Sequence, residues 1–132
     1  MDLLGKVVHR GACGSQMNQH IYVVIAQDCA DKTCLVVNFT TKRGTRTSAF
    51  TIEVKKSEFP QILTSDISTV EYGRAESISE SEFIECGIKK DSYGKPIVCP
   101  DALMKRILAQ IDAGSDLKNK FVRKYFPNSP IL

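Results

Sequence analysis

Apolar residues in the first half of the chain follow the spacing of β-strands. Residues 20–26 and 33–40 are apolar at almost every position, which is typical of strands that are buried on both faces. The turn-forming residues of 27–32 lie between these two runs and predict that they pair as an antiparallel hairpin. Three shorter strands are predicted at residues 6–10, 49–54 and 66–75.

Helical patterns begin later in the chain. Ser79 with Glu82 three residues on is a capping-box pattern, and it predicts one short helical turn that ends at Gly87. Pro100 is expected to open a longer helix whose apolar stripe ends at Gly114. A last helix is predicted to be capped by Ser115, to end at Pro127 and to turn Leu117, Phe121, Val122 and Tyr125 inward.

The order of these elements indicates a fold class. Strands come first and helices last, which favours an α+β domain whose sheet curls into a small barrel. At 132 residues the chain closes only one such core. We therefore divide it into a barrel domain with its helix, residues 1–114, and a C-terminal basic helix with its tail, residues 115–132.

Charge is distributed unevenly along the chain. Eighteen basic against fifteen acidic residues give a net charge of +3, while the hydrophobic fraction of 42% fits an ordinary globular protein. Residues 42–56 carry a local charge of 5 − 1 = +4, residues 66–91 carry 3 − 7 = −4, and residues 101–125 carry 6 − 3 = +3. This pattern suits a polyanion site with a separate acidic face, or equally a set of solvated surfaces of mixed charge.

The sequence lacks the motifs that are typical of several classes of protein. There is no apolar run of about 20 residues and no signal-peptide pattern, so we expect no membrane association and a cytoplasmic location. The five cysteines show no C-x-x-C spacing, which predicts no zinc site, and without an export signal we expect reduced thiols, with Cys34 as a small core residue. Because phosphate-loop and metal-hydrolase motifs are missing as well, we expect neither a metal nor a cofactor.

Polar residues meet at one end of the predicted hairpin. His20 begins its first strand and Thr40 with Thr41 end its second, so antiparallel pairing makes them neighbours. The loop after the hairpin brings Lys42, Arg43 and Arg46 to the same rim. A histidine can move protons, and an arginine can neutralise the charge that develops on a phosphodiester under attack. The alternative is that these are ordinary polar residues at strand ends.

The hairpin also carries a resemblance to a known family. The stretch His20-Ile-Tyr-Val-Val-Ile-Ala26, with the strand that ends in Phe39-Thr40-Thr41, resembles the PemK/MazF toxin endoribonucleases. Residues 66–75 look like a later segment of that family, and 100–111 look like its C-terminal helix. The resemblance implies an SH3-like barrel, commonly a homodimer, and metal-independent RNA cleavage by attack of the ribose 2′-hydroxyl. It also implies a small antitoxin protein that blocks the site.

The resemblance can be carried over to single residues. Thr40 matches the family's threonine, but His20 stands where the family has an arginine, and Ile21 replaces the proline that follows it. One hypothesis is a toxin endoribonuclease, and the other is an SH3-like barrel that binds nucleic acid or a partner protein without cutting. In the first, His20, Thr40 and Arg43 are the catalytic residues, and Thr41, Lys42, Arg46 and Arg74 contact RNA.

The C-terminal helix has two interpretations of its own. Its basic residues either form a solvated face while the helix packs on the barrel, or they contact nucleic acid or a partner groove. The residues concerned are Lys118, Lys120, Arg123 and Lys124.

Overall fold

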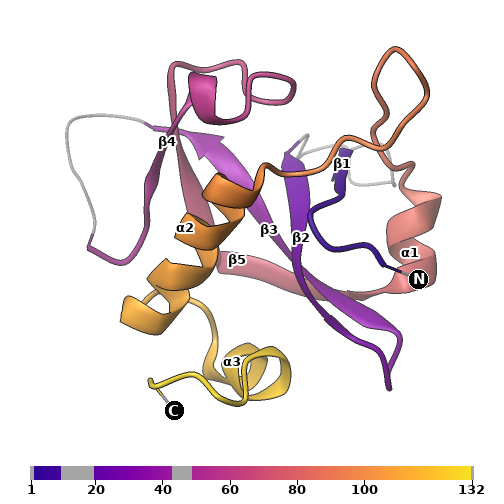
Figure 1. Cartoon of the computed structure of the whole chain (residues 1–132). Helices are drawn as coiled ribbons and strands as arrows, with labels where there is room; N and C mark the ends of the chain where they lie inside the picture. Colours follow the sequence, from indigo (N-terminus) through magenta and orange to yellow (C-terminus); the bar gives the residue numbers. More distant parts are fainter. Residues whose placement is uncertain (1, 10–19, 43–48, 132) are drawn as a thin grey trace.

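A five-stranded antiparallel sheet forms the centre of the computed structural model, which describes residues 2–9, 20–42 and 49–131 (Figure 1). The strands are ordered β1-β2-β3-β5-β4, and three α-helices accompany them. The predicted α+β class is therefore confirmed. The strands are β1 (Val7–His9), β2 (Ile21–Asp28), β3 (Thr33–Thr41), β4 (Glu53–Lys55) and β5 (Ile67–Ser79).

The predicted hairpin forms as β2 and β3. Its register runs from Ile21 opposite Phe39 to Asp28 opposite Thr33, with an irregularity after Val24. The Asp28 carboxylate accepts hydrogen bonds from the backbone N–H groups of Ala30 and Asp31, at 3.0 and 3.2 Å, and so holds the turn. Because both strands are central in the sheet, each needs apolar residues on both faces, which explains the unbroken apolar runs.

β5 is longer than the predicted strand, which covered residues 66–75. It pairs Glu71 with Asn38 and Glu76 with Val36, so five steps along β5 match two along β3. The predicted strand ends at residue 75, within this bulge, whereas β5 continues through the bulge to Ser79. Beyond the bulge Ile78 is buried, and its contribution to the core accounts for the extra length.

The strand predicted at residues 49–54 is largely wrong. Only Glu53–Lys55 pair as β4, and the alternation holds only for buried Val54 and half-buried Ile52, because Phe50 is 55% exposed. The preceding residues bond through side chains instead. The Thr51 hydroxyl donates to the Val70 carbonyl at 2.6 Å, and the Gln110 amide donates to the Ala49 carbonyl at 2.9 Å.

The helices are α1 (Glu80–Glu85), α2 (Asp101–Ala113) and α3 (Asn119–Tyr125). α1 begins as predicted, since the Ser79 hydroxyl accepts a hydrogen bond from the Glu82 N–H at 3.1 Å. α2 follows Pro100 and ends at Gly114, which has a φ of +120°. α3 begins later than predicted, because the Ser115 hydroxyl accepts from the nearby Leu117 N–H, at 3.2 Å, before the helix starts.

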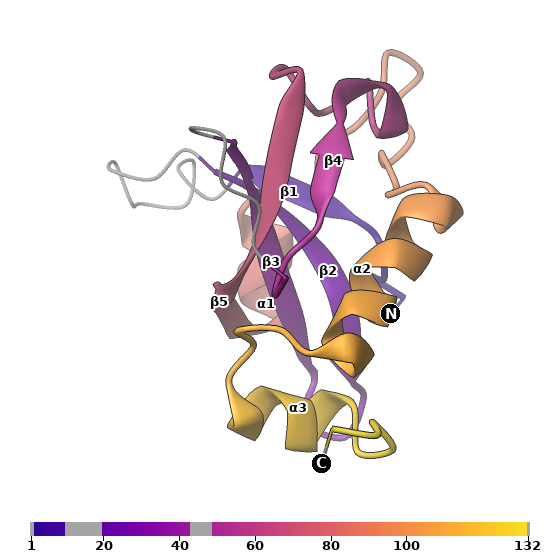
Figure 2. The same cartoon turned by 90° about the vertical axis from the view of Figure 1, so that its left-hand side faces the viewer.

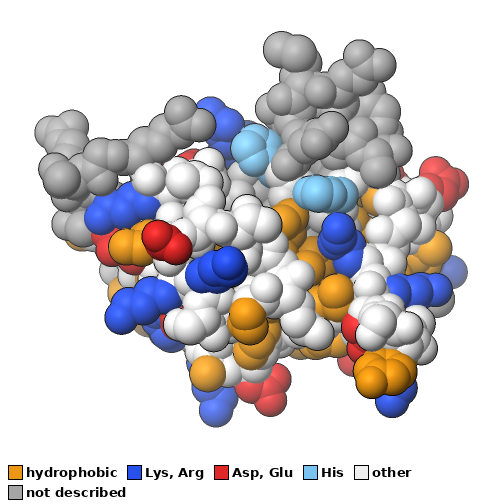
Figure 3. Space-filling model, turned by 90° about the horizontal axis from the view of Figure 1, so that it is seen from above, with side chains coloured by type: hydrophobic (Ala, Val, Ile, Leu, Met, Phe, Trp, Pro, Cys, Tyr) orange, Lys and Arg blue, Asp and Glu red, His pale blue; other side chains and the backbone are white. Residues whose placement is uncertain are grey.

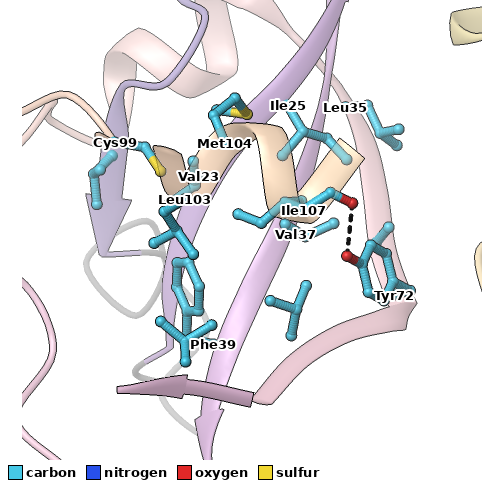
Figure 4. Close-up of a cluster of buried hydrophobic side chains, with 14 of the residues drawn as sticks. Val23, Ile25, Leu35, Val37, Phe39, Tyr72, Cys99, Leu103, Met104 and Ile107 are labelled. Carbon is cyan, nitrogen blue, oxygen red and sulfur yellow. Dashed lines mark hydrogen bonds between the residues drawn. The ribbon is translucent and has the colours of Figure 1, made fainter. Parts of the chain in front are cut away.

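Two hydrophobic cores lie on the two faces of the sheet. α2 and α3 cover one face (Figures 1 and 2), and their residues Ile107 and Val122 pack there with Val23 and Val37 (Figure 4 shows part of this core). The other face is covered by α1 and the N-terminal segment. Its core contains Leu3, Val8, Tyr22, Val24, Cys34, Val36, Ile78, Phe83 and Cys86. Cys34 is thus the core residue that the sequence predicts.

The C-terminal segment shares the first of these cores. Leu117 and Val122 are buried in it, and Phe121 and Tyr125 pack against it. The Lys124 ammonium also forms a salt bridge with Asp31 in the β2–β3 turn, at 2.6 Å. The basic residues of α3 are exposed, so this helix packs on the sheet with a solvated face.

We expect the Tyr72 hydroxyl to stabilise the packing of α2 on the sheet. Tyr72 is 2% exposed, and its hydroxyl donates to the Ile107 carbonyl at 2.7 Å (Figure 4). Tyr72→Phe should lower the free energy of unfolding by about 1 kcal/mol, the net value of one buried hydrogen bond. Chemical denaturation measures it, with Tyr93→Phe at an 87% exposed position as the control. Equal stability of the two variants would contradict this role.

Candidate functional site

A pocket of about 220 Å³ lies at the end of the sheet where β2 begins and β3 ends. The segment after the 3₁₀ helix η2 (Lys56–Glu58) forms its opposite wall. Apolar residues of the first core make up part of the lining, and a histidine and five hydroxyl residues make up the rest. The lining residues are His20, Ile21, Phe39, Thr40, Thr41, Ile62, Leu63, Thr64, Ser65 and Ser68.

Three of the predicted site residues meet in this pocket. Ile21 pairs with Phe39, and one position further along the strands His20 and Thr40 both line the pocket. Thr41 lines it as well, and its hydroxyl lies 2.7 Å from that of Ser65. His20 and Thr40 are half-buried, so both side chains are reachable by a ligand.

Three hydroxyl residues of the pocket were missed by sequence reasoning. Thr64 and Ser65 lie on the segment that leads into β5, and Ser68 pairs with Thr41 across β3 and β5. The Thr-Ser-Asp-Ile-Ser sequence before and within the predicted strand is the available signal. It is weak, because such residues are common at strand starts, and only the β3–β5 pairing brings them to His20.

The basic residues predicted at this rim have different outcomes. Lys42 is neutralised by Glu53, since its ammonium lies 2.5 Å from that carboxylate and its side chain is only 16% exposed. Arg43 and Arg46 lie outside the described residues. Arg74 is exposed in the β5 bulge, five residues beyond Thr69, the partner of Thr40, and it is not among the residues that line the pocket. The structure therefore does not bring Arg74 to the pocket.

A second histidine lies beside the pocket. His9 of β1 pairs with Ile21, one of the lining residues. Burial, and then the positive charge of Lys89, hold the pKa of His9 below its usual value. Its imidazole therefore favours the neutral form, which can accept a proton or a hydrogen bond.

The cysteines supply no nucleophile for this pocket among the described residues. Burial raises the pKa of Cys34 to about 11 and that of Cys99 to about 12, so both thiols stay protonated near neutral pH. Cys29 is exposed on the β2–β3 turn, at the other end of the hairpin. Cys86 is disulfide-bonded, which corrects the expectation that all the thiols are reduced.

Neither a metal site nor a membrane span is found in the described part of the chain. No three of its His, Cys, Asp and Glu side chains are grouped so that they would hold a metal ion. None of its helices is long and apolar enough to cross a membrane.

A second pocket, of about 440 Å³, is built on an ion pair. Arg106 of α2 bonds to the Glu58 carboxylate and, at 2.8 Å, to the Glu53 carbonyl; Lys55 and Ile67 complete the lining. Burial acts to raise the pKa of Glu58, but hydrogen bonds from the Lys55 N–H and from Arg106 outweigh it and lower that pKa. The bond between Arg106 and Glu58 ties η2 to α2 and so supports the wall of the first pocket.

We expect Glu58 to stabilise the fold in a pH-dependent way. Because its folded-state pKa lies below the ordinary value of 4.5, its contribution is complete above that value and is lost as the pH falls through the folded-state pKa. The loss of unfolding free energy caused by Glu58→Gln should therefore be larger at pH 7 than at pH 3. Denaturation at both pH values measures it, with exposed Glu85→Gln as the control. A loss that does not change with pH would contradict this assignment.

Comparison with known proteins gives no relative. No protein-family model, no curated protein and no solved structure matches the chain.

Proposed function

We propose that the pocket between β2, β3 and the segment after η2 binds a phosphodiester of single-stranded RNA, and that the protein is a metal-independent endoribonuclease. The observation that carries this proposal is the shared pocket of His20 and Thr40, with four further hydroxyl residues around them. An imidazole supplies proton transfer, and hydroxyl groups supply hydrogen bonds to phosphate oxygens.

The chemistry follows from these groups. The imidazole of His20 accepts the proton of a ribose 2′-hydroxyl, and the 2′-oxygen attacks the adjacent phosphorus. The bond from phosphorus to the 5′-oxygen breaks, and the departing oxygen takes up a proton from the imidazolium. The products are a 2′,3′-cyclic phosphate and a 5′-hydroxyl. The hydroxyls of Thr40 and Thr41 donate hydrogen bonds to the phosphate oxygens as negative charge develops there.

The biological setting belongs to the same proposal. A PemK/MazF-like toxin with an SH3-like barrel is consistent with the five-stranded sheet and with the position of α2 after it. Such a protein would act as a homodimer in the cytoplasm and would be blocked by a small antitoxin protein. Since disulfides are rare in the cytosol, this location requires that the fold be stable with Cys86 reduced.

Cleavage of RNA should depend on His20 and Thr40. Purified protein should cut single-stranded RNA in the presence of a metal chelator. Loss of a general acid–base group typically lowers the rate by about 10²- to 10⁴-fold, which we expect for His20→Ala, and a smaller loss for Thr40→Ala. Lys105→Ala, at an exposed position on α2, is the matched control. Undiminished cleavage by both site variants would exclude this pocket as the active site.

A second candidate function is binding of nucleic acid without cleavage. The observation that favours it is electrostatic: Lys42 is paired with Glu53, and Arg74 lies along β5 away from the pocket. Among the described residues, the lining therefore includes no lysine or arginine to neutralise a phosphorane, although hydroxyls and an imidazole suffice to hold a phosphate.

Salt dependence distinguishes the second candidate. A binding module should retain RNA without producing fragments, and its affinity should fall as salt rises, with a slope of about −0.7 per phosphate contacted on a single strand. Fluorescence anisotropy with a labelled oligonucleotide at several salt concentrations measures this slope. The candidate is excluded if no binding is detected at low salt.

A further inference from the structure

An exposed tyrosine stands at the tip of a hairpin between α1 and α2. Tyr93 is 87% exposed, the highest value among the large hydrophobic residues described, and the Lys90–Pro96 bridge closes the hairpin beneath it. Tyrosine side chains usually bury much of the ring. A ring held this far out contributes nothing to the core and is accessible to a ligand.

The tip that carries Tyr93 is rigid. The Asp91 carboxylate accepts hydrogen bonds from the backbone N–H groups of Tyr93 and Lys95, at 2.8 and 3.0 Å. The Asp91 N–H donates to the Lys95 carbonyl at 2.8 Å, and Gly94 has the positive φ, +78°, that the turn requires. The backbone that presents the ring therefore loses little conformational freedom when the ring binds a ligand.

The charge around Tyr93 is positive. Lys90 and Lys95 flank the tip, both are exposed, and neither forms a salt bridge with a described residue. With Lys89 at the base, residues 89–95 carry 3 − 1 = +2. The single acid is Asp91, whose carboxylate is engaged in the turn.

The hairpin is continuous with the side of the molecule that carries the pocket. Its base is bound to β1, where the Lys89 N–H donates to the Val7 carbonyl at 2.8 Å, and β1 in turn pairs His9 with Ile21 of the pocket. The segment between α1 and α2 rises above the sheet at the same end as β1 (Figure 1). Seen from that end, histidine side chains lie near the middle of the face with basic side chains beside them (Figure 3).

We propose that Tyr93 stacks on a base of single-stranded RNA while Lys90 and Lys95 bind the phosphates on either side of it. The inference rests on the proposed function, because the stacked base belongs to the strand whose phosphodiester occupies the pocket. Every base has a π-face, so this contact adds affinity with little sequence preference. Positive charge on both sides of an aromatic ring is complementary to alternating bases and phosphates, which favours RNA over a protein partner.

Binding to a catalytically silenced protein tests this inference separately from cleavage. The protein used is the full chain with His20→Ala, and the probe is a fluorescent single-stranded oligouridylate at low salt. Tyr93→Ala should weaken binding about tenfold or more, whereas Tyr93→Phe should change it less than twofold, because the ring remains. Lys90→Ala with Lys95→Ala should reduce the magnitude of the salt slope by about 1.4 for two lost phosphate contacts. Lys32→Ala with Lys105→Ala, also exposed, is the matched control.

The outcomes separate the two proposals. Binding that depends on Tyr93, in a protein whose wild type does not cut RNA, supports the stacking site and contradicts the proposed enzyme activity. Tight binding that Tyr93→Ala leaves unchanged overturns the stacking site and leaves the cleavage proposal intact. Absence of binding at low salt, or equal weakening by the control pair, also overturns the stacking site, and a protein ligand for the hairpin would then be the explanation for Tyr93.

Discussion

The register between β2 and β3 is the constraint on which the rest of the structure depends. Ile21 of β2 pairs with Phe39 of β3. His20, just before Ile21, and Thr40, just after Phe39, therefore lie side by side at the end of the hairpin. A slip of β2 by one residue would turn Val23 from the core under α2 to the opposite face and bring Val24 into its place, so the side chains of both cores would no longer fit. The two hydrophobic cores therefore fix the position of the polar site.

The pocket has a firmly anchored wall, and its described lining residues include no lysine, arginine or carboxylate. Its wall after η2 is anchored by buried Phe59 and by the Arg106–Glu58 pair, and the Ser65 hydroxyl on this wall lies 2.7 Å from that of Thr41 on the hairpin. Lys42, the nearest basic residue in the described chain after Thr41, is already paired with Glu53. The described lining would thus hold a phosphate by hydrogen bonds, and the lysines beside Tyr93 would add electrostatic attraction for neighbouring phosphates of the same strand.

Much of the fold was predictable, because it follows from local patterns. The hairpin, the Ser79 cap and the end of α2 at Gly114 each rest on residues close together in the sequence. The errors arise where distant contacts decide: Thr51 bonds to Val70 rather than extending β4, and the bulge in β5 is set by its pairing with β3. For the same reason His20 and Thr40 were predictable as neighbours, whereas Ser65 and Ser68 were not, since the β3–β5 pairing that brings them to the pocket has no short-range signal.

The central claim is that RNA occupies the pocket at the open end of the β2–β3 hairpin, and chemical-shift mapping by NMR tests it most directly. The ligand is a single-stranded oligonucleotide with 2′-deoxyribose throughout, which cannot be cut by attack of a 2′-hydroxyl. Our account predicts that the largest shifts fall on the backbone amides of Thr40, Thr41 and Ser65 and on the imidazole of His20. Shifts confined to α3, with the amides of the pocket unchanged, would contradict it.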